Sequence, residues 1–204
     1  IARMLLRKGV KKNYMAQIRT DSASNSKLMG VWKKAGLEVV VMGLEFVEKA
    51  RLDFVNKRSV PETNIRALEI ARQLGLKVWG CFIITPDFTK DDFRSVLEVC
   101  KRFKISYPQF THLTPLPGTD LYADATSKKT PWVLLNSDPE SFDWTRACFE
   151  TTEMPSQYFQ KEFRELYLRS YGVGFSEMLR KWLTGERDII TSVMLRLWLE
   201  NVLR

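Results

Sequence analysis

The chain has 204 residues, a net charge of +8 and 45% hydrophobic residues, values of an ordinary soluble domain with one sizeable core. No apolar run is long enough to span a bilayer, and the three cysteines lie too far apart for a disulfide framework or a CxxC-type metal site. We therefore expect buried thiols in a reducing, cytoplasmic setting. Because the sequence does not begin with Met, we also expect it to start inside a longer protein.

The N-terminal segment predicts a helix end, a short strand and a second helix. Residues 1–8 place apolar side chains on one helical face, and residues 14–18 form the strand. Ser22 or Ser24 is placed to cap a helix that runs through Ala35.

A strand–helix–strand unit over residues 35–84 organises the predicted fold. The runs 39–42 and 78–84 are nearly continuously apolar, which is typical of strands covered on both faces of a parallel sheet. Between them, residues 59–74 have apolar side chains at helical spacing. Such a unit has a right-handed crossover by default.

Glycine and capping residues mark the ends of these elements. Gly36 and Gly75 suit the left-handed backbone position just past a helix end. Ser59 and Glu62 have the spacing of a capping box at the start of the crossover helix.

The alternation continues with a helix over 91–103, a strand over 107–113 and the turn 114–119. Strands that alternate with helices imply an α/β fold with a parallel sheet, either doubly wound or curved into a barrel. From about residue 123 the pattern becomes irregular. We divide the chain into an α/β part over 1–124 and a helical C-terminal extension over 125–204.

The extension contains three apolar helical stripes, over residues 156–170, 175–183 and 190–198. Stripes of this kind most often pack on their own domain, and contact with a membrane surface or a partner is the less common alternative.

Charged and turn residues follow the predicted strands, where ligands bind in parallel α/β folds. These strand ends are Arg19–Asp21, Gly43–Glu45, Thr85–Asp87 and Thr114–Gly118. Three of them place charge directly after an apolar run. This is the strongest indication of function in the residues alone.

Each candidate also has a structural interpretation. Arg19 can grip a carboxylate of a ligand or pair with Asp21, and Glu45 can accept from hydroxyls or an amine or cap a helix. His112, the single histidine, fits a hydrogen-bonded core position better than a catalytic one.

The start of the chain is basic, and no acidic residue precedes Asp21. One hypothesis is therefore a non-catalytic α/β module that binds an anionic partner or a membrane surface. We prefer a solvated surface, or one that faces a missing domain, and expect no nucleic acid. The basic residues are Arg3, Arg7, Lys8, Lys11 and Lys12.

Together these motifs resemble the back half of the radical S-adenosylmethionine (SAM) enzymes, and in particular their cobalamin-binding branch. The segment WGCFIITPDFTKDDF is most similar to the hopanoid C-3 methylase type. The resemblance covers roughly residues 10–122. It is carried by Arg19-x-Asp21, Gly43-x-Glu45, Asn56-Lys57, Gly80-x-Phe82-Ile83 and Pro115-Leu-Pro-Gly-Thr-x-Leu-Tyr122.

The resemblance implies a partial (β/α) barrel of six strands, of which this chain would hold the third to the sixth. In the family, a C-x3-C-x2-C loop holds a [4Fe-4S] cluster that cleaves SAM to a 5′-deoxyadenosyl radical. That loop, the Gly-Gly-Glu segment after the second strand and a cobalamin domain are absent from this sequence. SAM, the cluster and cobalamin are thus the implied cofactors, with the cluster ligands elsewhere.

The resemblance also implies SAM-binding roles by position. Arg19 would face the SAM carboxylate or its surroundings, and Glu45 the ribose or the amino end. Phe46 stands where the family has Ser, and Thr85–Thr89 replaces the usual G-x-P-x-E-T. The adenine would lie along Gly80, Phe82 and Ile83, and would be edged by the backbone of Thr114, Pro115 and Leu116.

The function implied is that of a cobalamin-dependent methyltransferase acting on an unactivated carbon. A hopanoid or other lipid-like small molecule would be its substrate, and the missing N-terminal part of the same protein its partner. The apolar tail leaves peripheral membrane contact open. We expect the chain by itself to be inactive, and no residue in it can be assigned as catalytic.

Overall fold

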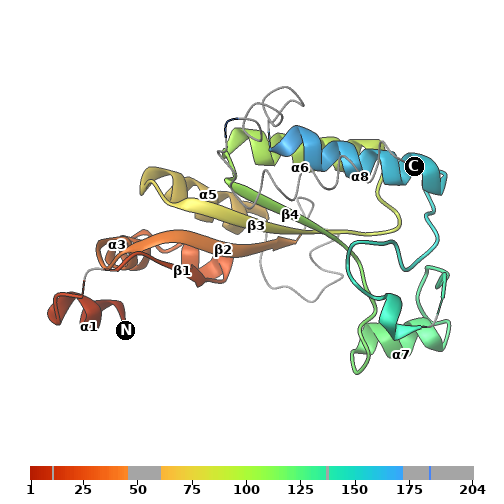
Figure 1. Ribbon diagram of the computed structural model, residues 1–204, viewed down its shortest axis with the longest axis horizontal. Coiled ribbons are helices and arrows are strands. Elements are labelled where there is room, and N and C mark those ends of the chain that lie inside the picture. Colours follow the sequence, from red (N-terminus) through yellow and green to blue (C-terminus); the bar gives the residue numbers. More distant parts are fainter. Residues whose placement is uncertain (11, 46–60, 137, 172–183, 185–204) are drawn as a thin grey trace.

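The computed structural model describes residues 1–10, 12–45, 61–136, 138–171 and 184. It confirms the α/β fold class (Figure 1). The elements are α1 (Ala2–Arg7), β1 (Tyr14–Gln17), α2 (Thr20–Ala23), α3 (Ser26–Lys34), β2 (Leu37–Glu45), α5 (Pro61–Gln73), β3 (Lys77–Ile84), α6 (Lys90–Arg102), β4 (Tyr107–His112), α7 (Asp120–Thr126), the 3-10 helix η1 (Pro139–Ser141) and α8 (Ser156–Ser170).

The four strands form one parallel sheet in the order β1-β2-β3-β4. Each strand is hydrogen-bonded to the next one along the chain, and a helix crosses over between neighbours. Right-handed crossovers that always advance in the same direction put their helices on the same face of the sheet. A doubly wound sheet reverses its strand order at the switch point, and the described strands show no such reversal.

The main core lies between this helical layer and one face of the sheet. Strand alternation sends every second side chain into it, and α8 contributes Phe159, Phe163 and Leu166. The strand residues in this core are Leu37, Val40, Met42, Leu44, Val78, Phe82, Ile84 and Phe110. The opposite face, called the inner face below, carries the half-buried positions Val41, Gly43, Trp79, Cys81, Ile83, Tyr107, Gln109 and Thr111.

A second cluster lies beyond the carboxyl ends of the strands, around α7 (Figure 1). It is built on Leu113, Ala125, Trp132, Phe142, Cys148 and Phe149. An isolated antiparallel bridge pairs Leu134 with Phe149. The sequence pattern did not predict α7, because a seven-residue helix is too short to show a clear period.

The ends of the helices confirm two predicted glycine positions and correct one predicted N-terminal cap. Gly36 and Gly75 have φ values of 107° and 61°, as expected for residues past a helix end. The cap of α3 is Asn25, whose side chain accepts from the amide of Leu28, so the prediction of Ser22 or Ser24 was wrong. The reason is that residues 20–23 form the separate short helix α2.

Several predictions lie outside the described residues: the Ser59 cap, the pair Asn56-Lys57, Lys11, and the stripes over 175–183 and 190–198. The boundary at residue 124 stays a prediction, and α7 crosses it. Among the described helices, none has both the length and the hydropathy that a membrane span needs.

Candidate functional site

The carboxyl ends of all four strands lie along one edge of the sheet, because neighbouring strands are parallel. Arg19 follows β1, Glu45 is the last residue of β2, and Ile84 is the last residue of β3. The turn at Pro115 comes soon after β4 ends at His112. The fold therefore places these strand-end residues on the same edge, where ligands bind in parallel α/β folds.

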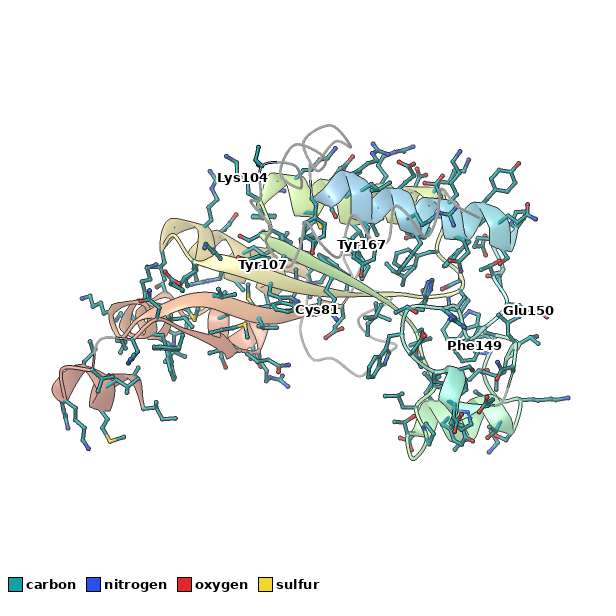
Figure 2. All side chains as sticks on the ribbon, viewed as in Figure 1. Cys81, Lys104, Tyr107, Phe149, Glu150 and Tyr167 are labelled. Atoms are coloured by element: carbon teal, nitrogen blue, oxygen red, sulfur yellow. The ribbon has the colours of Figure 1, made fainter. Side chains whose placement is uncertain are left out.

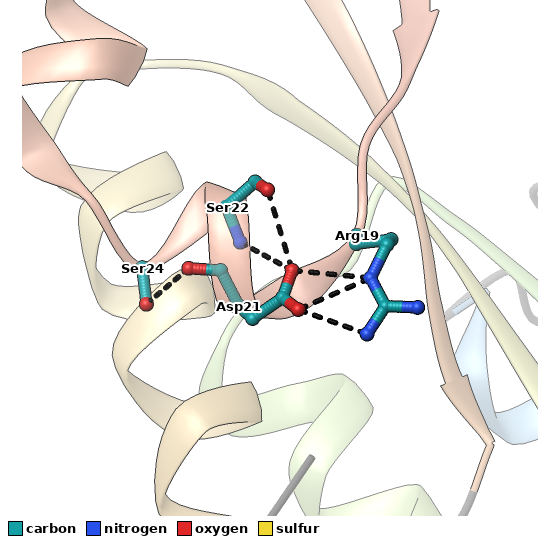
Figure 3. A network of polar contacts seen from close by, with 4 residues as sticks. All are labelled: Arg19, Asp21, Ser22 and Ser24. Carbon is teal, nitrogen blue, oxygen red and sulfur yellow. Dashed lines mark hydrogen bonds and ion pairs between the residues drawn. The ribbon is translucent and has the colours of Figure 1, made fainter. Parts of the chain in front are cut away.

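Arg19 forms an ion pair with Asp21 at this edge (Figure 3). Arg19 Nη2 lies 2.9 Å and Nε 3.1 Å from Asp21 Oδ2, and the amide of Ser22 donates to Asp21 Oδ1 at 2.6 Å. The hydrogen bond with Asp21 raises the pKa of Arg19, and the one with Arg19 lowers the pKa of Asp21.

Both side chains of this pair remain open to solvent, at 69% and 50% exposure. An exposed pair contributes little to stability. The guanidinium is thus already held in a geometry that suits a carboxylate, at a surface that a ligand can reach.

Glu45 ends β2 in an unusual backbone conformation. Its φ is 59°, in the left-handed region that non-glycine residues rarely adopt, and the ladder with β3 shifts register between Gly43 and Glu45. Such a conformation costs on the order of 1 kcal/mol and persists only where the surroundings impose it. Lys104, Lys128 and Trp144 also have a positive φ, and of these four residues Glu45 is the one that ends a strand at this edge, which makes it the candidate.

The three residues predicted along the adenine do not share a face of the sheet. Gly80 and Phe82 face the helical layer, where the Phe82 ring stacks on Phe110 with centroids 5.6 Å apart. Ile83 lies on the inner face and packs against the second cluster. A ligand on the inner face could therefore meet the side chain of Ile83, but only the backbone of Gly80 and Phe82.

The predicted turn after β4 is stiff and leads directly into α7. Gly118 has a φ of 85°, and Thr119 caps α7 through its hydroxyl, which accepts from the amide of Tyr122. The carbonyl of Leu116 accepts from both the hydroxyl and the amide of Thr119, at 2.7 and 3.1 Å. The carbonyl of Leu116 is thus already engaged within the turn.

The inner face carries a polar pair that sequence reasoning missed. Trp79 Nε1 donates to Gln109 Oε1 at 2.8 Å, and Cys81 Sγ lies 3.8 Å from the same oxygen (Figure 2 labels Cys81). Because an indole can only donate, this bond fixes the orientation of the Gln109 amide. The available signal was the period-2 alternation of β3 and β4, which puts Trp79 and Gln109 on the same face.

His112 is a core residue, as predicted, but its hydrogen bonding differs from the expectation. It is 3% exposed on the helical side, and its ring stacks on Phe163 at 4.1 Å. Among the described residues, no group pairs with its Nε2. Burial lowers its pKa to about 4, although Asp143 acts in the opposite direction. The imidazole is therefore neutral at pH 7 and lies away from the inner face.

The cysteines do not supply a cluster site. All three are free thiols. Cys100 is buried as expected, Cys148 is also buried, and Cys81, which was expected to be buried, is only half-buried. Burial raises the pKa of Cys100 to about 12. Within the described ranges, no three His, Cys, Asp or Glu residues are grouped to hold a metal ion. These residues do not fit a [4Fe-4S] cluster, which takes thiolate ligands.

The basic residues near the N-terminus do not converge on a site. Arg3, Arg7, Lys8 and Lys12 are exposed on α1 and the segment after it. This agrees with a solvated surface.

Comparison with known proteins finds several relatives that are named as methyltransferases or methylases. No protein-family model matches the chain. It is 32% identical over 155 residues to the hopanoid C-3 methylase of Methylococcus capsulatus, a match that covers 74% of this chain and 28% of that protein. It is 27% identical over 172 residues to an uncharacterized methyltransferase of Pyrococcus horikoshii, covering 84% and 37%. A bacteriochlorophyllide d C-8(2)-methyltransferase of Chlorobaculum tepidum is 26% identical over 162 residues, covering 78% and 35%.

Solved structures match the fold. The cobalamin-dependent S-adenosylmethionine radical enzyme OxsB superposes with a TM-score of 0.60 at 15% identity, over 98% of this chain and 34% of that one. The radical S-adenosylmethionine methyltransferase TsrM from Kitasatospora setae, with cobalamin and a [4Fe-4S] cluster bound, gives 0.58 at 10% identity, over 86% and 40%. The chain thus spans about a third of the length of the relatives it matches. The resemblance seen in the sequence motifs is confirmed.

Proposed function

We propose that this chain, a homologue of cobalamin-dependent radical SAM methyltransferases, forms one side of the SAM pocket of such an enzyme. The observation that carries the proposal is the common edge of the sheet along which Arg19, the strained Glu45 and the turn after β4 lie. In parallel α/β folds this edge is the ligand-binding edge.

In this proposal Arg19 binds the carboxylate of SAM. Its guanidinium is exposed and already pairs with a carboxylate, that of Asp21. A guanidinium can bind a carboxylate bidentately. Glu45 accepts from the amino group or from the ribose hydroxyls, since an ionised carboxylate is an acceptor only.

The adenine lies against the side chain of Ile83 and the backbone of Thr114 and Pro115. This arrangement takes account of the strand alternation, which turns the side chains of Gly80 and Phe82 toward the helical layer. Leu116 contributes by stiffening the turn through its two hydrogen bonds from Thr119.

When bound, SAM and cobalamin supply methyl-transfer chemistry, and the cluster supplies the electron that cleaves SAM. The described residues fit SAM through their charged and backbone groups, and they do not fit the cluster. We assign the cluster ligands and the cobalamin site to a part of the protein that precedes this chain. The chain's share of its relatives, about a third, supports that assignment.

We further propose an unactivated carbon of a hopanoid or another lipid-like molecule as the methyl acceptor. The support is the 32% identity to the hopanoid C-3 methylase over 74% of the chain. The working compartment in this proposal is the cytoplasm.

The test is SAM binding to the complete protein, reconstituted without oxygen, in the variants Arg19→Gln and Glu45→Gln. Loss of one charge-assisted hydrogen bond should weaken SAM binding by about tenfold to a hundredfold. Equilibrium dialysis with labelled SAM measures this change, and 5′-deoxyadenosine formation measures its effect on SAM cleavage.

Arg94→Gln is the matched control. Arg94 forms a similarly exposed ion pair, with Asp91 at 2.6 Å, but on α6, where it borders the groove between α6 and α8. Its loss should leave SAM affinity unchanged. Equal affinity in all three variants would overturn the proposed pocket.

A further inference from the structure

The end of β2 is tied to the start of α5 by one buried hydrogen bond. Asn64, in the first turn of α5, is 5% exposed and donates from Nδ2 to the carbonyl of Leu44 at 2.9 Å. A buried side-chain donor aimed at a strand carbonyl holds that carbonyl in one orientation.

Gly80 holds the same residue from the neighbouring strand. A Cβ at Gly80 would lie 3.0 Å from Leu44 Cδ1 and 3.2 Å from Ile105 Cγ2. The Leu44 side chain, which is almost fully buried, therefore fills the space that a side chain at position 80 would take. Leu44 is held at two points, by its carbonyl and by its side chain.

These two contacts of Leu44 also constrain the backbone of Glu45. The Leu44 carbonyl belongs to the same planar peptide unit as the Glu45 amide, so fixing one fixes the other. Glu45 then takes a φ of 59°, a left-handed conformation that costs a residue other than glycine on the order of 1 kcal/mol.

We propose that Asn64 and Gly80 are positioning residues, which hold Glu45 in its left-handed conformation so that its carboxylate meets the bound SAM. The inference rests on the SAM pocket proposed above. In this proposal Gly80 packs against the side chain of Leu44. The sequence resemblance had instead implied a contact between Gly80 and the adenine.

The first test is SAM binding to the complete protein in the variants Asn64→Asp and Gly80→Ala. Asn64→Asp keeps the shape but replaces the donor with a carboxylate oxygen, which repels the Leu44 carbonyl, whereas Gly80→Ala pushes on the Leu44 side chain from the neighbouring strand. Each should weaken SAM binding roughly threefold to tenfold, because the carboxylate of Glu45 would no longer be held in position for its hydrogen bond to SAM. In a Glu45→Gln background, neither should weaken binding further, because the positioned carboxylate is gone.

Ile70→Val is the control for general loss of stability. Ile70 is buried on the same helix, α5, and the substitution removes one methylene without touching Asn64. Its SAM affinity should equal that of the wild type. Thermal unfolding of every variant shows which ones are folded at the temperature of the binding assay.

A second readout needs no ligand. Glu45→Gly should raise the melting temperature of the otherwise wild-type protein, because glycine adopts positive φ without strain. The gain should be smaller in the Asn64→Asp background, where the strained conformation is no longer enforced.

The outcomes separate the two proposals. If Glu45→Gln weakens SAM binding while Asn64→Asp and Gly80→Ala behave like Ile70→Val, the positioning role is wrong and the pocket stands. If Glu45→Gln leaves SAM binding unchanged, the role of Glu45 in the pocket fails, and the positioning role fails with it. An equal gain from Glu45→Gly in both backgrounds would also overturn the positioning role.

Discussion

His112, the single histidine of the chain, is buried against α8, and this burial keeps its imidazole neutral at pH 7. Its Nε2 has no partner among the described residues, and burial lowers its pKa from 6.5 to about 4. The unfolded chain therefore binds a proton at this residue between pH 6.5 and about 4, whereas the folded protein does not. Protonation of the unfolded chain then favours unfolding as the pH falls.

We expect the contribution of His112 to stability to be constant above pH 6.5 and to decrease as the pH falls to about 4. Over that range the loss should be on the order of 3 kcal/mol, since one pKa unit corresponds to about 1.4 kcal/mol. Urea unfolding between pH 4 and pH 8 measures it.

The variant His112→Leu isolates this effect from the titration of carboxylates. Its free energy of unfolding should not include the pH dependence that His112 causes. The difference in free energy of unfolding between wild type and variant should therefore change with pH only between about 4 and 6.5. A difference that is the same at every pH would show that His112 titrates normally in the folded protein.

At the scale of elements, α8 protects the outer edge of β4. Tyr167 donates its hydroxyl to the carbonyl of Phe110 at 2.6 Å and accepts from the amide of Phe110 at 3.0 Å (Figure 2). Tyr171 donates to the carbonyl of Pro108 at 2.8 Å. Backbone groups at a sheet edge are otherwise open to pairing with another strand, so these tyrosines satisfy an edge that a further strand would occupy.

Removing these hydroxyls should lower stability in proportion to the bonds lost. Tyr167→Phe removes two partners from β4 and should cost about 1–3 kcal/mol, whereas Tyr171→Phe removes one and should cost about 1 kcal/mol. Urea unfolding monitored by circular dichroism measures both.

Tyr158→Phe on the same helix is the control, because Tyr158 is 58% exposed. Its effect should stay within about 0.5 kcal/mol, as for most surface substitutions. If Tyr167→Phe were as mild as the control, α8 would not stabilise the edge of β4 through these bonds.

At the scale of the whole molecule, the crossover helices and α8 lie on one face of the sheet, and α7 lies beyond the carboxyl ends of the strands. The candidate ligand groups lie at that edge and on the inner face. This division leaves the inner face, with Trp79 and Gln109, on the side of the sheet away from the helices of the main core. It also leaves the three cysteines apart: Cys81 on the inner face, Cys100 in the main core and Cys148 in the second cluster.

Residues 1–204 alone should therefore fail to acquire a [4Fe-4S] cluster. Anaerobic reconstitution with iron and sulfide should give no visible absorption band of a thiolate-ligated cluster. The complete protein, treated in parallel, should show that band. A cluster on residues 1–204 would contradict the assignment of the ligands to another part of the protein.

Local sequence determined the elements. Apolar runs of period one or two predicted the strands, and Gly36 and Gly75 predicted the left-handed helix ends, because these features depend on neighbouring residues alone. The parallel α/β class followed from the alternation of strands and helices. The short α2 and α7 were missed, since a helix of one or two turns leaves no periodic signal.

Only the tertiary structure decided how the predicted site residues are divided between faces and partners. Gly80 accommodates the Leu44 side chain rather than a ligand, and Asn64 reaches the end of β2 from α5. These relations join residues that are distant in the sequence, and they depend on strand register and helix docking. The sequence pattern predicts which face of the sheet a strand residue points to. It does not predict which group from another element contacts that residue.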